Sequence, residues 1–409
     1  MELTSVILII VGVVWAGFLV LPFLLTLAGL FRNDPVGEKT EVRDYDYACV
    51  ITAYRNAAIT EGLIESLLNQ TYKHFHIYLV ADACDLSGWN LSDERLTVLK
   101  PEPALNLKIK SVIHAMDHFV RPHDFTVVFD ADNLAHPDFL SVINDFACRG
   151  WKSIQGQRTA KNLDTVYACA DAIGEFYKNW IDRYMPWRLG SSAVISGSGM
   201  AVETGLYRAY LASKEISEGQ HQYKRMLQED KILQNFLLRQ NERIAYAWDA
   251  IVYDEKVSSG DAVETQRSRW LFSYFQNTGN ALGILRRGLV NLSFNQLLFG
   301  LITIAPPMFI QVGVGVLLAG LALFTVPWVS LLLLLSLLVF GLNIFLVLYL
   351  SKVPPQIWRA IWHLPAFVFR QMKALLKMSN PDKNFKPTEH NKKVKIDELL
   401  KQPGAESQP

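Results

Sequence analysis

The chain has 409 residues, of which 50% are hydrophobic and 19% are charged, and its formal net charge is +1. This composition excludes a disordered or collagen-like chain, and the near-neutral charge gives no indication of a nucleic-acid partner. The length predicts two or three domains. Residues 3–31 and 288–351 carry no charge, whereas the block between them is mixed and charged. The sequence therefore predicts a soluble domain between membrane segments.

The first uncharged run is long enough to cross a bilayer, which takes about 20 apolar residues. It lacks the positive start and the small-residue cleavage site of a signal peptide, so we expect an uncleaved anchor. Prolines divide the second run into two further spans, Met308–Val326 and Val329–Leu350. The apolar stretch before them, Phe294–Ala305, is too short to cross alone and is expected either to lie at the membrane interface or to lead into the next span.

Positively charged residues lie beside these spans on one side only. Arg32, Arg286 and Lys352 flank the spans, whereas the connection at residues 325–330 is uncharged. Because Lys and Arg stay in the cytoplasm, we expect the N-terminus outside the plasma (inner) membrane, and the central block and the C-terminal tail inside. The expected parts are an anchor, a cytosolic domain, an interface segment with two spans, and an amphipathic interface helix with a polar tail: 1–33, 40–285, 289–351 and 354–409.

The central block alternates β-rich runs with helical patterns. Strands are expected at Tyr47–Ala53, His76–Ala81, Arg95–Lys100 and Phe125–Phe129, and helices at 60–68, Leu107–Phe119 and His136–Phe146. Continuous apolar strands between helices predict a mainly parallel α/β sheet that is covered on both faces. Ligands bind outside the carboxyl ends of such strands, where Asp82 and Asp130 stand.

Two acidic clusters are candidates for chemistry. Asp130-Ala131-Asp132 directly follows a strand, and its carboxylates either share a hard divalent cation or belong to a turn that caps the next helix. Glu229-Asp230 opens an amphipathic helix over Lys231–Gln240. These acids either complement the helix dipole or include a general base, Asp230.

Two further clusters carry donors and glycines. In Gln266-Arg267-Ser268-Arg269-Trp270, the first, fourth and fifth residues share one helix face. They offer an amide and a guanidinium to phosphate oxygens and an indole to a sugar ring, unless the helix only lies at the interface. The glycines of Ser196-Gly197-Ser198-Gly199-Met200 allow a close backbone approach to a ligand, or form a plain loop.

Four of these features, in this order and between spans, resemble the membrane-integrated family 2 glycosyltransferases: Asp82, Asp130-Ala131-Asp132, Glu229-Asp230 and Gln266-Arg267-Ser268-Arg269-Trp270. That group includes cellulose, chitin, hyaluronan and poly-N-acetylglucosamine synthases. The resemblance covers about residues 45–380 and extends to residues 156–162, 196–200 and 253–255. It implies a GT-A (Rossmann-like) domain inserted between transmembrane helices, with amphipathic interface helices.

The resemblance also implies a nucleotide-diphospho-sugar donor, usually a UDP-sugar, and Mg²⁺ or Mn²⁺ held by Asp130 and Asp132. Asp230, beside Glu229, would be the catalytic base. The donor nucleotide would contact Thr52, Ala53, Tyr54, Arg55, Asp82, Lys110 and Asp130. The diphosphate and the acceptor would contact Gln266, Arg269, Trp270, Gly197 and Ser198. Residues 52–57 lack the proline and glutamate usual in the first nucleotide loop, and Gln228 replaces a common threonine, which leaves the donor's identity open.

One base without a second nucleophile predicts inversion, so an α-linked donor would give a β-linkage. Three functions remain open. A synthase would extend a β-linked polysaccharide through its own spans, which Trp270 favours as a platform for a glycan. A non-processive enzyme would transfer one sugar to a lipid or lipid-linked acceptor, which the presence of only three spans favours. A non-catalytic export or scaffold subunit is the third. We expect the synthase, in the lipid bilayer, as a homodimer or with an accessory export subunit.

Overall fold

The computed structural model describes residues 3–224, 227–376 and 394–401. Its centre is one eight-stranded sheet with the order β3-β2-β1-β4-β7-β6-β8-β5. The strands are β1 Tyr47–Tyr54, β2 Phe75–Asp82, β3 Leu96–Leu99, β4 Phe125–Asp130, β5 Leu134–Ala135, β6 Ser153–Ala160, β7 Met200–Glu203 and β8 Ala245–Asp254. The four strands expected from the sequence are therefore present, each within two residues of its predicted ends.

The sheet is mixed in direction. Strands β3, β2, β1 and β4 are parallel, with Tyr47 opposite both Phe75 and Phe125. Strand β7 is antiparallel to both its neighbours, β4 and β6, and β5 is antiparallel to β8. All residues of β2 are buried, so both of its faces are covered, as continuous apolar strands predict. The expected α/β class is confirmed, and the antiparallel strands are an addition to the prediction.

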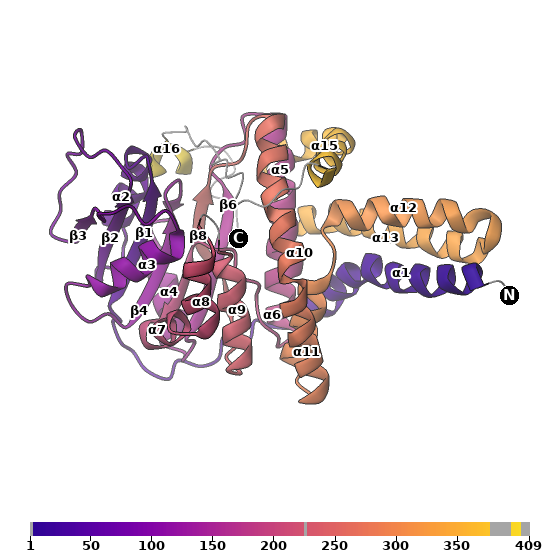
Figure 1. Cartoon of the computed structure of the whole chain (residues 1–409), viewed down its shortest axis with the longest axis horizontal. Coiled ribbons are helices and arrows are strands. Elements are labelled where there is room, and N and C mark those ends of the chain that lie inside the picture. The colour runs from indigo at the N-terminus through magenta and orange to yellow at the C-terminus, as the bar shows by residue number, and fades with distance from the viewer. Residues whose placement is uncertain (1–2, 225–226, 377–393, 402–409) are drawn as a thin grey trace.

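Helices surround this sheet, and together they form the sheet domain. They are α2 Glu61–Leu68, α3 Lys108–Asp117, α4 Phe139–Ala147, α5 Val166–Lys178, α6 Met185–Arg188, α7 Thr204–Leu211, α8 Lys214–Gln222 and α9 Glu229–Arg239, with a 3-10 turn η1 Ala58–Thr60 and a π-helical turn η2 Asn179–Tyr184. The turn η2 continues α5 directly into α6. Helix α5 thereby forms one long rod along the side of the domain that faces the apolar helices (Figure 1).

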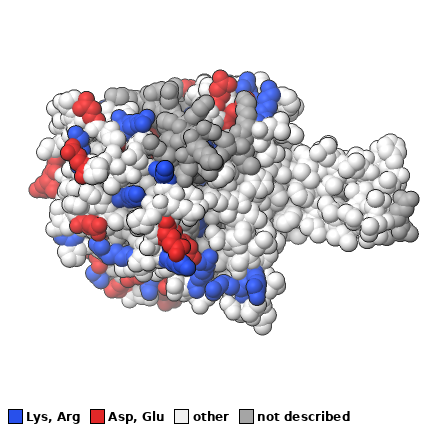
Figure 2. Space-filling model, viewed as in Figure 1, with Lys and Arg blue, Asp and Glu red and all other residues white. Residues whose placement is uncertain are grey.

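Three helices, α1 Leu3–Leu30, α12 Met308–Thr325 and α13 Pro327–Leu350, are long and apolar enough to cross a membrane. They lie side by side and project from the sheet domain (Figure 1), and their visible surface carries no charged side chain (Figure 2). A Cβ at Gly12 would lie 2.5 Å from Val329, and one at Gly315 would lie 3.2 Å from Leu19. These small residues allow the three helices to pack closely.

The N-terminal end of α1 and the connection between α12 and α13 both lie at the far end of this projection (Figure 1). The sheet domain lies at the opposite end. This arrangement agrees with three spans, and the side of the membrane that each end occupies remains a prediction, as do the domain boundaries.

Several helices lie between the sheet domain and the projecting helices. They are α10 Gly260–Val290, α11 Phe294–Ile304, α14 Pro355–Ala360, η3 Ile361–His363 and α15 Leu364–Leu376. The amphipathic helix expected within 354–409 is interrupted at η3, because Pro365 cannot donate a backbone hydrogen bond. Helix α15 packs on α10 through Phe367, while its Phe369 is 61% exposed.

Part of the expected tail returns to the sheet. Helix α16 Ile396–Leu400 packs on β5 and β8, with Ile396 in one cluster with Leu134 and Tyr253. Lys395 reinforces this contact through an ion pair of 3.1 Å with Glu65. The tail is therefore not polar throughout, and the rest of it lies outside the described residues.

Candidate active site

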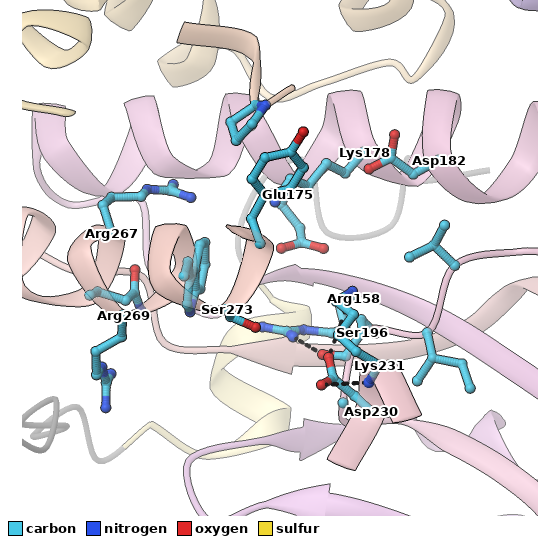
Figure 3. Close-up of a pocket in the computed structure, with 18 of the residues that line it drawn as sticks. Arg158, Glu175, Lys178, Asp182, Ser196, Asp230, Lys231, Arg267, Arg269 and Ser273 are labelled. Carbon is cyan, nitrogen blue, oxygen red and sulfur yellow. Dashed lines mark hydrogen bonds and ion pairs between the residues drawn. The ribbon is translucent and has the colours of Figure 1, made fainter. Parts of the chain in front are cut away.

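One cavity of about 1000 Å³ begins at the carboxyl ends of β1, β2 and β4 and extends between α1, α12 and α13. Asp82 and Asp130 line its sheet end, and Phe18 and Phe340 line its membrane end. Figure 3 shows side chains around its central part, including several from α5, α9 and α10. The cavity lies where parallel α/β sheets bind ligands, and it brings most of the predicted site residues together.

The end of β1 and the residue that follows it form the first wall of this cavity. All four residues from Thr52 to Arg55 line it, as expected. Arg55, Ala83 and Asn106 all have left-handed backbone conformations, with φ of 66°, 54° and 56°. Non-glycine residues rarely adopt this region, and such strain is typical of functional sites. The three strained residues lie in neighbouring loops at the sheet end of the cavity.

Asp82 holds these loops together. One carboxylate oxygen accepts the N–H of Leu105 at 2.7 Å, and the other accepts the N–H of Asn106 at 2.6 Å. Its own carbonyl accepts the N–H of Arg55 at 3.0 Å. Asp82 therefore shapes the pocket through the backbone, and its predicted contact with a nucleobase remains a prediction.

Lys108 connects three of the predicted clusters, and the sequence analysis missed it. Its Nζ donates to Asp130 Oδ1 at 2.6 Å and to the carbonyl of Gly197 at 3.0 Å, and it lies 3.7 Å from Glu229 Oε1. Burial opposes its charge, but Asp130 and Glu229 outweigh this effect and raise the pKa of Lys108. Lys110, which was assigned to the nucleotide pocket, does not line this cavity but a neighbouring pocket that shares Asn106 with it. Its predicted contact with the nucleotide remains a prediction.

The turn after β4 presents two carboxylates to the cavity. Asp132 is 8% exposed, and its Oδ2 accepts the N–H of Glu255 at 3.1 Å. The side chain of Asn133 closes the turn by accepting the N–H of Asp130 at 3.0 Å. Asp130 and Asp132 thus line the same cavity, and their oxygens are the ligand type that Mg²⁺ and Mn²⁺ prefer. Among the described residues no group of three metal-binding side chains occurs.

Asp230 lies in the first turn of α9, opposite the glycine loop. Its Oδ1 accepts the N–H of Lys231 at 2.8 Å, and its Oδ2 lies 3.8 Å from the position of a Cβ at Gly197. Gly197 has a φ of 87°, which favours glycine, and thus leaves space in front of the carboxylate. Burial raises the pKa of Glu229, and Asp230 adds to this shift against the attraction of Lys108. Ser198 is fully buried and does not line the cavity, contrary to expectation.

Helix α10 contributes the predicted donor face. Gln266, Arg269 and Trp270 all line the cavity, and burial lowers the pKa of Arg269. Arg267 instead forms an ion pair with Asp171 of α5. Its Cζ lies 4.3 Å from the centre of the Trp270 ring, so part of this ring already contacts a cation.

A buried ion network, which no motif in the sequence indicated, also lines the cavity. Arg158 of β6 pairs with Asp254 of β8, and Lys256 lies 2.9 Å from Asp254 and 3.4 Å from Glu175. Arg183 pairs with Glu175 at 2.8 Å. Arg158 and Asp254 come from two stretches already noted as family-like. The sequence does contain one pattern that could have indicated the part of this network on α5 and η2. Charged residues recur there at intervals of three or four, along one helix face: Asp171, Glu175, Lys178 and Asp182.

Comparison with known proteins gives the family. No curated protein matches the chain. The fold matches a mannosyltransferase from Pyrobaculum calidifontis, solved in complex with GDP-Man and Mn²⁺, with a TM-score of 0.54 and 13% identity over 92% of this chain and 100% of that chain. TarS 1–349 from S. aureus matches with a TM-score of 0.40 and 13% identity over 82% of this chain and 92% of that chain. The expected GT-A fold is confirmed, and because residues 45–273 match the model of glycosyltransferase-like family 2, the chain belongs to this family.

Proposed function

We propose that this glycosyltransferase moves one sugar, with inversion, from a nucleotide-diphospho-sugar to a lipid or lipid-linked acceptor at the membrane surface. The observation that carries this proposal is the continuity of the cavity. Its sheet end is lined by Arg55, Lys108 and Asp130, and its other end by Phe18 and Phe340 of the apolar helices. One end is suited to an anionic nucleotide and the other to hydrocarbon.

The sheet end would bind the donor. Arg55, Lys108 and Arg158 supply positive charge along its walls, and cations of this kind bind phosphate oxygens. We retain a UDP-sugar as the expected donor. GDP-Man is the second donor to test, because the structurally similar mannosyltransferase was solved with it.

A divalent cation fits the sheet end. Asp130 and Asp132 would hold Mg²⁺ or Mn²⁺, and when bound the cation would neutralise charge on the departing diphosphate. Lys108 and the cation would share the carboxylate of Asp130, since Lys108 Nζ already donates to it. The Mn²⁺ of the similar mannosyltransferase supports this assignment.

Asp230 would act as the general base, a role worth about 10²–10⁴-fold in rate. It would take the proton of the acceptor hydroxyl as the oxygen forms its bond to C1 of the sugar. The bond between C1 and the diphosphate breaks in the same step. One displacement inverts the configuration, so an α-linked donor would give a β-linked product.

The packing of the apolar helices favours a lipid acceptor over a growing polysaccharide. Helices α1, α12 and α13 all contact one another. Gly315 of α12 packs between Leu19 of α1 and Leu337 of α13, since a Cβ at Gly315 would lie 3.2 Å from each of these side chains. The cavity enters between these helices and is lined by Phe18 of α1, Val312 of α12 and Phe340 of α13. It ends close to this Gly315 contact, because no residue of α1 before Phe18 or of α12 after Val312 lines it. An acceptor entering from the bilayer needs no passage through them.

The experiment uses membranes that contain the protein, labelled UDP-sugars or GDP-Man, and Mg²⁺ or Mn²⁺. We expect label in the organic-extractable lipid fraction, carrying a single sugar, and a loss of at least about 10²-fold with Asp230→Asn. Long products would establish the synthase instead. Donor hydrolysis that Asp230→Asn leaves unchanged would contradict the role of this base, and no nucleotide release with any donor would favour a scaffold subunit.

A further inference from the structure

Lys178 lies at the junction of the sheet domain and the projecting helices. It is the last residue of α5 and lines the cavity. The ring of the preceding residue, Tyr177, packs on Phe340 of α13 with ring centres 5.9 Å apart. Lys178 therefore places a positive charge where the cavity changes from polar to apolar walls.

Most carboxylates around Lys178 form ion pairs with other basic side chains. Asp171 pairs with Arg267, and Glu175 pairs with both Arg183 and Lys256. Asp182 lies close enough to Lys178 to influence it. Within the described chain, however, no carboxylate forms an ion pair with Lys178. Its Nζ contacts the ring of Trp270, at 5.2 Å from the ring centre.

Arg267 adds a second cation to the same space. Its Cζ lies over the Trp270 ring that Lys178 also contacts. Figure 3 shows Lys178 extending from α5 and Arg267 from α10 into the space between these helices. Burial and the like charge of Arg267 lower the pKa of Lys178 to about 8. An anion bound between the two side chains would relieve both effects, whereas a neutral sugar would relieve neither.

We propose that the acceptor carries a phosphate between its lipid and its head group, and that Lys178, with Arg267, binds this phosphate at the membrane end of the cavity. This inference rests on the proposed function. Lysine serves as a point charge for phosphate, and Ile181, Phe340 and Ile344 line the cavity nearby for the hydrocarbon.

The phosphate is an anchor and not the nucleophile. Asp230 extends from α9, on the other side of the cavity from Lys178 (Figure 3). A head group held by its phosphate at Lys178 would reach toward Asp230 with a hydroxyl. The proton of this hydroxyl goes to Asp230, and its oxygen forms the new bond to C1.

The test compares two pairs of acceptors, with the full-length protein in nanodiscs. The first pair is an isoprenyl-phosphate-linked glucose and the same glucose linked directly to the isoprenol. The second pair is phosphatidylglucose and monoglucosyldiacylglycerol. The members of each pair differ only in the linking phosphate, and the two pairs distinguish an isoprenoid from a glycerolipid source. We expect a KM at least about tenfold lower for the phosphate-bearing member of one pair, the effect of about 1.4 kcal/mol.

Variants assign this preference to Lys178. Lys178→Ala and the similarly sized Lys178→Met are expected to raise the KM of the phosphate-bearing acceptor about tenfold or more, while kcat and donor hydrolysis change little. Lys178→Arg should restore most of the preference. Arg286→Ala removes an exposed cation from α10 and serves as the control, with the wild-type KM. Retained donor hydrolysis shows that each variant is folded.

The outcomes separate the two proposals. Equal KM values within each pair, or equal effects of Lys178→Met on both members, would overturn the phosphate site and leave the lipid acceptor in place. Donor hydrolysis without transfer to any of the four lipids would overturn the lipid acceptor and the phosphate site together.

Discussion

At the scale of single residues, Lys108 holds Asp130 in an ion pair at the place proposed for a divalent cation. Replacing it with Met removes one positive charge and frees this carboxylate. We expect Lys108→Met to bind Mn²⁺ about tenfold more tightly in the absence of donor, equivalent to about 1.4 kcal/mol. Titration of the purified protein, with free Mn²⁺ measured by electron paramagnetic resonance, gives the affinity directly.

Lys110→Met is the matched control, because Lys110 is on the same helix but lines a different pocket. Its Mn²⁺ affinity should equal that of the wild type. Weaker Mn²⁺ binding by Lys108→Met than by Lys110→Met would mean that the lysine supports the cation, against the competition proposed here.

The lowered pKa of Lys178, about 8, gives the acceptor site a pH dependence. The charged groups that act on it are Arg267 of α10 and, along its own helix and η2, Glu175, Asp182 and Arg183. Lysine is charged below its pKa, so kcat/KM for a phosphate-bearing lipid should fall as the pH rises through about 8. Lys178→Arg should abolish this fall, because a guanidinium keeps its charge. The same fall in both proteins would assign it to another group.

The sequence does not show which of two lysines, Lys108 or Lys110, lies in the cavity. Lys108 and Lys110 are two positions apart at the start of one helix, so they point to different sides of it. The apolar positions of that helix show which side faces the core, but not which flanking lysine faces Asp130. In contrast, Asp130 and Asp230 both line one cavity, as the family resemblance implied. Each stands in a pattern that the sequence shows, because Asp130 ends a buried strand and Asp230 opens an amphipathic helix.

At the scale of secondary structure elements, the close contact of α10 and α11 positions the residues of α10. A Cβ at Gly288 would lie 2.4 Å from the backbone nitrogen of Leu297, so Gly288→Ala must move the two helices apart. Gly283 lies on the same helix with no atom within 4 Å of a Cβ. We expect Gly288→Ala to lower the melting temperature in detergent.

Gly283→Ala should keep or raise that temperature, because alanine favours a helix by about 1 kcal/mol over glycine. Differential scanning fluorimetry of both variants makes the comparison. Equal melting temperatures would show that the α10–α11 contact is loose in the folded protein.

Local patterns predicted strands and helices better than their directions. The strands β1, β2 and β4 were evident from continuous apolar runs, and all are parallel neighbours. Strand β7 has only four residues after the glycine loop. Its antiparallel direction follows from pairing with β4 and β6, which a short run cannot reveal. The pair of Arg158 and Asp254 is likewise a product of β6 lying beside β8.

At the scale of the whole molecule, the described helices place the connection between α12 and α13 at the opposite end from the sheet domain. With the predicted orientation, Thr325→Cys should react with a membrane-impermeant maleimide in intact cells, whereas Lys352→Cys should react only after lysis. The four native cysteines are free and buried, which keeps the background low. Labelling of Lys352→Cys in intact cells would reverse the orientation.

The continuity of the cavity has a kinetic consequence for a lipid acceptor. The donor would arrive from water, and its concentration would be set by the volume of the solution. The acceptor would arrive by lateral diffusion, so its availability would be set by its share of the membrane area. Adding inert lipid would then slow the reaction without any change in the amounts of enzyme, donor and acceptor, whereas diluting the buffer would lower only the supply of donor.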